Sequence, residues 1–131
     1  MNDAVRVPAL VLDHVQLAAP PGCEAAARRF YGELLGLTEL EKPATVQGRG
    51  GVWFALGDGR QLHIGVADRF VAATKAHPAL AAADGPALHA LAGRLTAAGM
   101  RVDWDEQLPE VERFYTTDPF GNRLELLALA G

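Results

Sequence analysis

The chain has 131 residues, half of them hydrophobic and 21% charged, which is the composition of a single globular domain over 1–131. The net charge of −4 argues against a nucleic-acid partner, and no apolar stretch reaches the roughly 18 to 20 residues that span a membrane. The lone Cys23 cannot form an intramolecular disulfide and no secretory leader is evident, so we expect a cytoplasmic protein in which Cys23 is a small buried thiol.

The first half of the chain predicts one strand, one helix and three further strands. Residues 10–18 alternate as a strand, and Pro20-Pro21-Gly22 ends it. Apolar residues at helical spacing predict a helix from Cys23 to Leu35, which Gly36 caps. Gly57-Asp58-Gly59 predicts a hairpin turn. The other strands of this half are expected at 37–42, 51–56 and 60–66.

The second half predicts the same order of elements. After a linker at 68–76, a strand at 77–83 leads to Asp84-Gly85-Pro86, where Pro suits the start of a helix. This helix should reach Ala98, with Gly99 as its cap and His89 on its surface. Further strands are expected at 101–105, 111–117 and 122–129. The predicted fold class is therefore α+β, built from two βαβββ modules, 8–67 and 77–131.

Four polar side chains occupy duplicated positions in these modules. His14 recurs 63 residues later as His77, and His63 recurs 62 residues later as Glu125. In the strands of His14, His63 and Glu125, the polar residue lies on the face opposite a hydrophobic one. A hydrogen-bonded core histidine is the alternative for His14, but an unpaired carboxylate is costly to bury among apolar residues. The repeat therefore predicts two half-sites for one metal ion.

The most distinctive stretches of the chain are 12–15, 30–37 and 113–126. Through them the chain resembles the vicinal oxygen chelate superfamily, which includes glyoxalase I, bleomycin-resistance proteins, fosfomycin-modifying enzymes and extradiol dioxygenases. The resemblance implies two modules whose sheets curl into half-open barrels around a divalent metal. It also implies a homodimer, in which the first module of one subunit faces the second module of the other.

The resemblance assigns His14, His63, His77 and Glu125 as metal ligands. All four together suit Zn(II), Ni(II) or Co(II), whereas His14, His77 and Glu125 alone suit Fe(II) or Mn(II) with open positions. Such an ion chelates a substrate through adjacent oxygens and stabilises the anion that forms. Glyoxalase-type isomerisation usually has a carboxylate at the end of both modules. Here only Glu125 remains, so Glu125 would carry the proton with His63 assisting.

Further polar and aromatic side chains on strand positions are expected to line a substrate pocket, with ordinary sheet packing as the alternative: Gln16, Trp53, Gln61, Arg113 and Tyr115. The leading expectation is a metal-dependent lyase or isomerase that moves a proton on a small oxygenated metabolite, as glyoxalase I does. An Fe(II)-dependent extradiol-type dioxygenase is the first alternative. A metal-free protein that sequesters a small molecule, as bleomycin-resistance proteins do, is the second.

Overall fold

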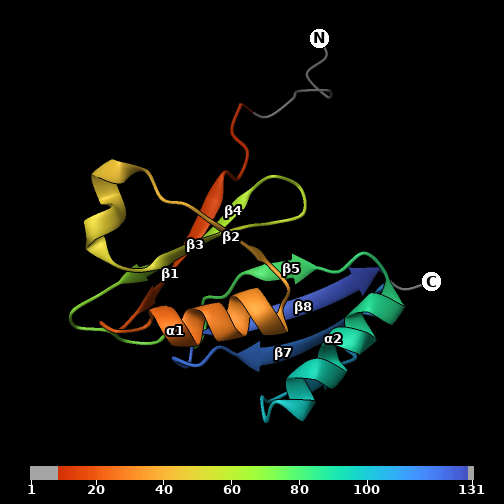
Figure 1. Cartoon of the computed structure of the whole chain (residues 1–131). Coiled ribbons are helices and arrows are strands. Elements are labelled where there is room, and N and C mark those ends of the chain that lie inside the picture. The colour runs from red at the N-terminus through yellow and green to blue at the C-terminus, as the bar shows by residue number, and fades with distance from the viewer. Residues whose placement is uncertain (1–8, 130–131) are drawn as a thin grey trace.

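The computed structural model, which describes residues 9–129, contains two four-stranded sheets with the same strand order (Figure 1). The first sheet consists of β1 (His14–Ala19), β4 (Gln61–Val66), β3 (Val52–Ala55) and β2 (Thr38–Leu40). The second consists of β5 (Ala79–Ala81), β8 (Arg123–Leu129), β7 (Val111–Thr117) and β6 (Asp103–Asp105). In each sheet the first strand pairs in parallel and the others pair antiparallel. The predicted α+β fold of two βαβββ modules is confirmed, with open sheets; the predicted module start at residue 8 lies outside the described residues.

One helical segment follows the first strand of each module. In the first module, α1 (Glu24–Ala27) continues as the wider π-type turns of η2 (Arg28–Leu34), where the N–H of Leu35 donates to the carbonyl of Phe30. In the second, α2 (Gly85–Ala97) begins where the side chain of Asp84 accepts a hydrogen bond from the N–H of Ala87 at 2.8 Å. Gly36 and Gly99, the two predicted caps, both have φ of +80°.

Several predicted strands are shorter than expected, among them those at 10–18 and 77–83, and one element was missed. The strand predicted over 10–18 begins only at His14, because its ladder partner β4 begins at Gln61, directly opposite His14. The strand predicted over 77–83 shrinks to β5, since Pro78 has no N–H to donate to a ladder. The short 3₁₀ helix η3 (Ala44–Arg49) lies where no element was predicted.

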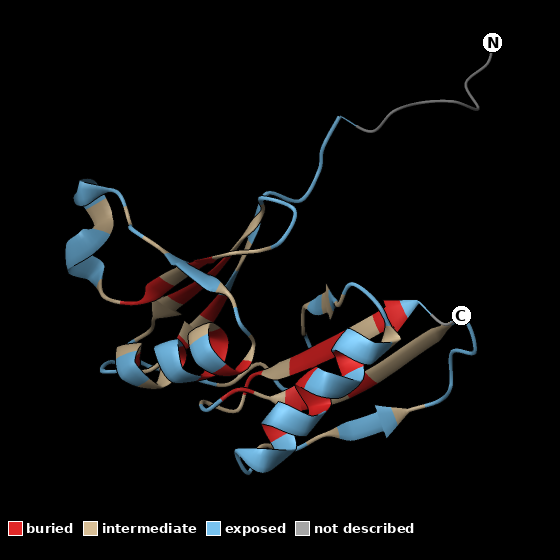
Figure 2. Cartoon of the chain, turned by 45° about the vertical axis from the view of Figure 1, so that its right-hand side comes forward, coloured by how far each residue is buried: buried red, intermediate tan, exposed pale blue. Residues whose placement is uncertain are grey.

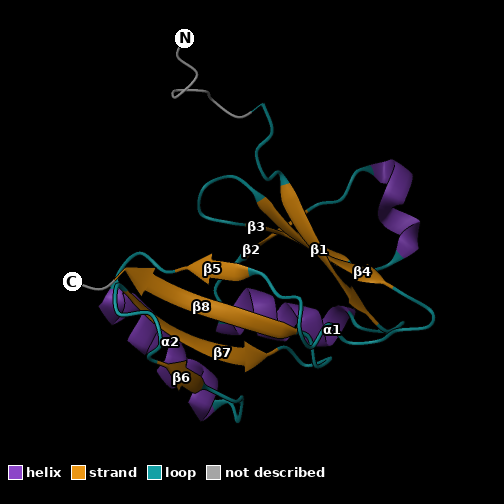
Figure 3. Ribbon diagram, turned by 180° about the vertical axis from the view of Figure 1, so that it is seen from behind, coloured by secondary structure: helices purple, strands orange, loops and turns teal. Residues whose placement is uncertain are grey.

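The helices cover one side of the sheets and leave the other side free for polar residues. Leu17, Ala19, Leu62 and Ile64 are buried in the core, whereas Gln16 on the opposite face of β1 is exposed. Figure 2 shows the buried residues concentrated on the strands and on the helix surfaces that meet them. Seen from behind, β5, β8 and β7 lie in front of α1 and α2, so this face of the second sheet carries no helix (Figure 3).

Buried hydrogen bonds join the two modules. The hydroxyl of Tyr31 in η2 donates to Oδ2 of Asp118, and the side chain of Asn122 donates to the carbonyl of Ala18 and accepts from the N–H of Ala73. Tyr31, Asp118 and Asn122 therefore each have a hydrogen-bond partner in another part of the fold. Within the described residues, no helix combines the length and apolar character that crossing a bilayer requires.

Candidate metal centre

The second module brings His77 and Glu125 together. Glu125 lies on β8, and its N–H donates to the carbonyl of Pro78, so the chain just before β5 runs beside it. Nε2 of His77 lies 3.2 Å from Oε1 of Glu125. Extending the ladder back by two residues from the Ala79–Glu125 pair puts His77 opposite Arg123, as His14 lies opposite Gln61 in the first module. The duplication therefore extends to the positions of these histidines.

The hydrogen-bonding pattern of His77 shows that its contact with Glu125 needs a cation. Nδ1 of His77 lies 2.9 Å from the carbonyl oxygen of Lys75, which can only accept, so Nδ1 carries the hydrogen. Nε2 of the neutral ring then presents a lone pair to a carboxylate oxygen, and the two repel unless a proton or a metal ion lies between them. Two ligands held by one ion at about 2.0–2.1 Å lie about 2.8–3.4 Å apart in octahedral or tetrahedral geometry. The observed 3.2 Å fits this range.

Glu125 is buried, and its second carboxylate oxygen, Oε2, also has a side-chain partner. Only 7% of the residue is exposed, and Nη1 of Arg113 lies 3.4 Å from Oε2. Nη2 of Arg113 also lies 3.4 Å from the carboxylate of Asp105. Arg113, predicted as a pocket residue, therefore orients Glu125 and compensates its charge, which leaves Oε1 directed at His77.

The first module brings His14 and His63 together in a stack of rings. His63 lies between the indole of Trp53, with ring centroids 3.8 Å apart, and the imidazole of His14, with centroids 4.4 Å apart. Nε2 of His63 lies 2.8 Å from Oε1 of Gln61. Burial lowers the pKa of His63, and the neighbouring His14 lowers it further, so the ring is neutral near pH 7.

The stacked geometry limits how His14 and His63 can bind one ion. The lone pair of an imidazole nitrogen lies in the plane of the ring, and these two planes are only 19° from parallel. Stacked planes do not meet at a nearby point, so only one ring can be a ligand unless a side chain rotates. Nδ1 of His14 lies 2.8 Å from the carboxylate of Asp13, the kind of contact that fixes metal-binding histidines and leaves Nε2 for the metal.

A single chain holds the two pairs on different sheets. His14 and His63 belong to the first sheet, whereas His77 and Glu125 belong to the second or to the chain leading into it. Among residues 9–129 no group of three or more His, Cys, Asp or Glu side chains is close enough to hold a metal ion. Each module thus supplies half of the predicted ligand set.

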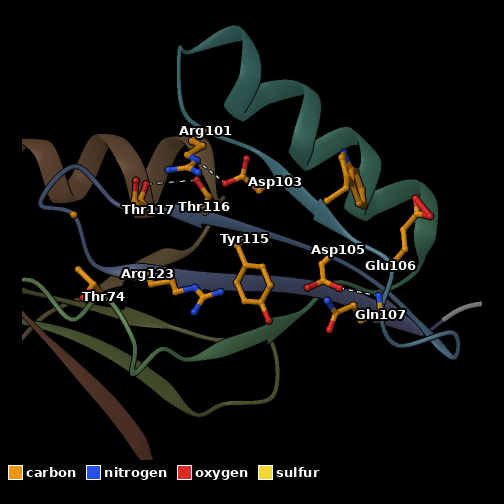
Figure 4. Close-up of a pocket in the computed structure, with 12 residues that line it drawn as sticks. Thr74, Arg101, Asp103, Asp105, Glu106, Gln107, Tyr115, Thr116, Thr117 and Arg123 are labelled. Atoms are coloured by element: carbon orange, nitrogen blue, oxygen red, sulfur yellow. Dashed lines mark hydrogen bonds and ion pairs between the residues drawn. The ribbon is translucent and has the colours of Figure 1, made fainter.

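A cavity of about 670 Å³ lies along the second sheet; neither His77 nor Glu125 lines it, but Tyr115, which pairs with Glu125 in the ladder, does. Of the five predicted pocket residues, Tyr115 lines this cavity. Trp53 and Gln61 contact His63 instead, and the side chain of Gln16 packs over Gly65. Figure 4 shows Tyr115 at its centre, with Arg123 extending toward the ring. Arg123 was not among the predicted pocket residues, although its alternation with Glu125 on β8 already placed both side chains on one face.

Two other predictions made outside the site are confirmed. His89 on α2 is exposed, and its Nε2 lies 2.8 Å from the carboxylate of Glu112. Cys23 is 2% exposed, and burial raises the pKa of its thiol. Neither residue lies in the candidate centre.

Comparison with known proteins agrees with this architecture. The model of the Glyoxalase/Bleomycin resistance protein/Dioxygenase superfamily matches residues 12–126. A solved structure from Bacillus anthracis, named as a glyoxalase family protein, is 42% identical with a TM-score of 0.88, over 96% of this chain and 100% of that one. A lactoylglutathione lyase from Agrobacterium tumefaciens is 21% identical with a TM-score of 0.69, over 94% and 96% of the two chains, and shares the fold. A comparison with curated proteins finds no match.

The family match covers most of the chain, and the protein therefore belongs to the Glyoxalase/Bleomycin resistance protein/Dioxygenase superfamily. The predicted resemblance to the vicinal oxygen chelate proteins is confirmed. A fold of this kind carries several chemistries, so the activity has to be argued from the side chains.

Proposed function

We propose that this protein is a divalent-metal enzyme that isomerises a small oxygenated metabolite by moving a proton, in the manner of glyoxalase I. The observation that carries the proposal is the contact between Nε2 of His77 and Oε1 of Glu125 at 3.2 Å, with Nδ1 of the same ring beside the carbonyl oxygen of Lys75. This arrangement leaves Nε2 and Oε1 as the atoms that would hold a divalent ion. The lone, buried Cys23 supports a reducing, cytoplasmic location.

The ligand set of the proposal comes from two copies of the chain. His14 of one subunit joins His77 and Glu125 of the other in a homodimer, in which the first sheet of each copy faces the second sheet of its partner. The proposal is supported by the division of the ligands between the two sheets and by the absence of a three-ligand group within the described residues. Each dimer then has two equivalent sites.

The chemistry divides between the metal and the side chains. A bound divalent ion supplies a Lewis acid that stabilises negative charge on a substrate chelated through adjacent oxygens. His63, neutral because its pKa is lowered by burial, is in the form that accepts a proton. Trp53 and Gln61 hold the His63 ring in place, and Arg113 orients the carboxylate of Glu125.

A second candidate function is an Fe(II)-dependent dioxygenase of the extradiol type. The specific observation in its favour is the stack of His14 and His63, which allows only one of the two rings to bind an ion. The remaining set of two histidines and one carboxylate is typical of non-haem Fe(II) enzymes that leave positions open for substrate and oxygen.

Metal analysis of protein purified without chelators tests the proposal. We expect about one divalent ion per chain in the wild type and almost none in His14→Ala or Glu125→Ala. His89→Ala, which changes an exposed histidine outside the centre, should retain the metal. Zinc, nickel or cobalt supports the isomerase, whereas Fe(II) with oxygen uptake supports the dioxygenase. If no metal binds even when these ions and Mn(II) are supplied, the protein is a small-molecule binder and both enzyme proposals fail.

A further inference from the structure

We infer that Arg123 binds an anionic oxygen group, a carboxylate or a phosphate, of the ligand that occupies the cavity of the second sheet. This inference extends the proposed function by naming the chemical class of its substrate. Arg123 opens β8, and its side chain lies on the same face as that of Glu125, two residues further along the strand. It lines the cavity together with Tyr115, Thr117 and Thr74 (Figure 4).

Arg123 differs from the neighbouring arginines in its partners. Arg101 pairs with Asp103 at 2.5 Å, and Arg113 pairs with Asp105 and Glu125 at 3.4 Å. Among the ion pairs formed by residues 9–129, none includes Arg123. Arg123, a half-buried residue beside the cavity, therefore has no carboxylate partner within the described residues, which favours an acceptor supplied by the ligand.

The position of the guanidinium favours an acceptor with two oxygens. Its central carbon lies 4.1 Å from the centroid of the Tyr115 ring, so stacking fixes one face of the group. The N–H donors of a guanidinium point outward in its own plane and remain available to a planar, two-oxygen acceptor. A carboxylate is such a group, and a tetrahedral phosphate can present two of its oxygens to the same donors.

Tyr115 connects the proposed anion site to the metal pair. Its ring meets the ring of His77 edge-on, with centroids 5.5 Å apart, while Arg123 stacks on the same tyrosine. Two residues of one strand are separated by about 7 Å, which is the distance from Arg123 to Glu125 along β8. One small molecule can therefore present its chelating oxygens to the metal pair and its acidic group to Arg123.

The charges of the cavity are consistent with an anion once a metal is bound. Two arginines, Arg101 and Arg123, line the cavity with three carboxylates, those of Asp103, Asp105 and Glu106, which gives a formal charge of 2 − 3 = −1. A divalent ion at the nearby His77–Glu125 pair would add two positive charges beside it. Asp103, Asp105 and Glu125 already have arginine partners, so Arg123 is the cation that remains for the ligand.

Calorimetric titration tests the inference with three probes: glycolate, its neutral analogue glycolamide, and inorganic phosphate. The probes are added to the wild type, Arg123→Gln and Arg101→Gln, each with and without supplied zinc and with its zinc content measured. Arg101→Gln is the matched control, because Arg101 lines the same cavity but is paired with Asp103. We expect glycolate or phosphate to bind the wild type and Arg101→Gln, and to bind Arg123→Gln about ten-fold more weakly.

The outcomes separate this inference from the proposed function. Binding of glycolate alone assigns a carboxylate, and binding of phosphate alone assigns a phosphate. Equal affinities in Arg123→Gln and the wild type overturn the inference, as does binding of neither anion or equal binding of glycolamide. If the wild type supplied with zinc binds none, but Arg123→Gln still weakens anion binding, the proposed function fails and the anion site stands. If zinc binds and Arg123→Gln leaves anion binding unchanged, the anion site fails and the proposed function stands.

Discussion

The hydroxyl of Tyr31 donates a 2.7 Å hydrogen bond to Oδ2 of Asp118 and so joins the first module to the second. Burial raises the pKa of Tyr31 well above its ordinary value, and the nearby Asp118 raises it further, so the hydroxyl remains a donor. The same aspartate accepts hydrogen bonds from Asn122, whose side chain contacts the first strand. This cluster holds the two sheets in the arrangement that places one ligand pair on each.

Tyr31→Phe should therefore lower the free energy of unfolding by about 1–3 kcal/mol, because a buried carboxylate oxygen loses a donor. Urea denaturation measures the change. Tyr115→Phe removes a hydroxyl from the cavity lining and should change stability by less than about 0.5 kcal/mol. Equal losses in the two variants would mean that the bond to Asp118 does not stabilise the fold.

Gly51 precedes β3 at a point where no side chain fits. Its φ is +84°, and an added Cβ would lie 2.1 Å from the carbonyl oxygen of Ile64. Gly51→Ala should lower the unfolding free energy by at least about 2 kcal/mol. Gly93 lies within α2 with no atom near its added Cβ, so Gly93→Ala should raise it by about 0.5–1 kcal/mol. Thermal or urea unfolding distinguishes the two, and a neutral Gly51→Ala would contradict the close approach of β3 and β4.

Glu24 should make stability depend on pH. Its carboxylate accepts a 2.7 Å hydrogen bond from the N–H of Gly51, and this bond is the main cause of the lowered pKa of Glu24. The unfolded state then binds a proton more readily than the folded state, so the stabilisation is complete above the ordinary pKa near 4.5 and is lost as the pH falls through the lowered value. Between pH 7 and pH 3 the wild type should lose more stability than Glu24→Gln, and parallel curves would refute this assignment.

The stack of Trp53 on His63 offers an optical test of the first half-site. Trp104 is the other tryptophan, so Trp104→Phe leaves Trp53 as the only indole. Titration of this variant with zinc should change its tryptophan fluorescence, because Trp53 contacts His63 and His63 contacts His14. The response should be lost when His14→Ala is added. A response that survives this change would place the metal away from His14.

The repeat in the sequence was enough to predict the order of elements and the two pairs of side chains, His14 with His63 and His77 with Glu125. His14 and His77 are 63 residues apart, and His63 and Glu125 are 62 apart. Hydrophobic alternation predicted which strand face carries His14, His63 and Glu125. The residues at which the strands begin could not be predicted, because a strand begins only where a residue of the neighbouring strand lies opposite to pair with it. His14 begins β1 since Gln61 begins β4.

The detailed contacts of the site also lay beyond the sequence. Nothing in the pattern around Arg113 indicates that it turns toward Glu125 and Asp105, or that Arg123 lies closer than Arg113 to the Tyr115 ring. The orientation of the His14 and His63 rings likewise depends on packing against Trp53. Such contacts arise from side-chain packing, which periodicity does not specify.

The shared metal site is tested most directly by mixing two variants that each lose a different half. His14→Ala breaks the half-site of the first module, and Glu125→Ala breaks that of the second. With the subunits tagged differently and the mixed dimer isolated, our account predicts about one metal ion per mixed dimer and almost none in either parent homodimer. One of its two sites would then combine an intact His14 with an intact His77 and Glu125. A mixed dimer that binds no metal, while the wild type binds about one ion per chain, would show that the two modules of one chain pair with each other and would contradict the account.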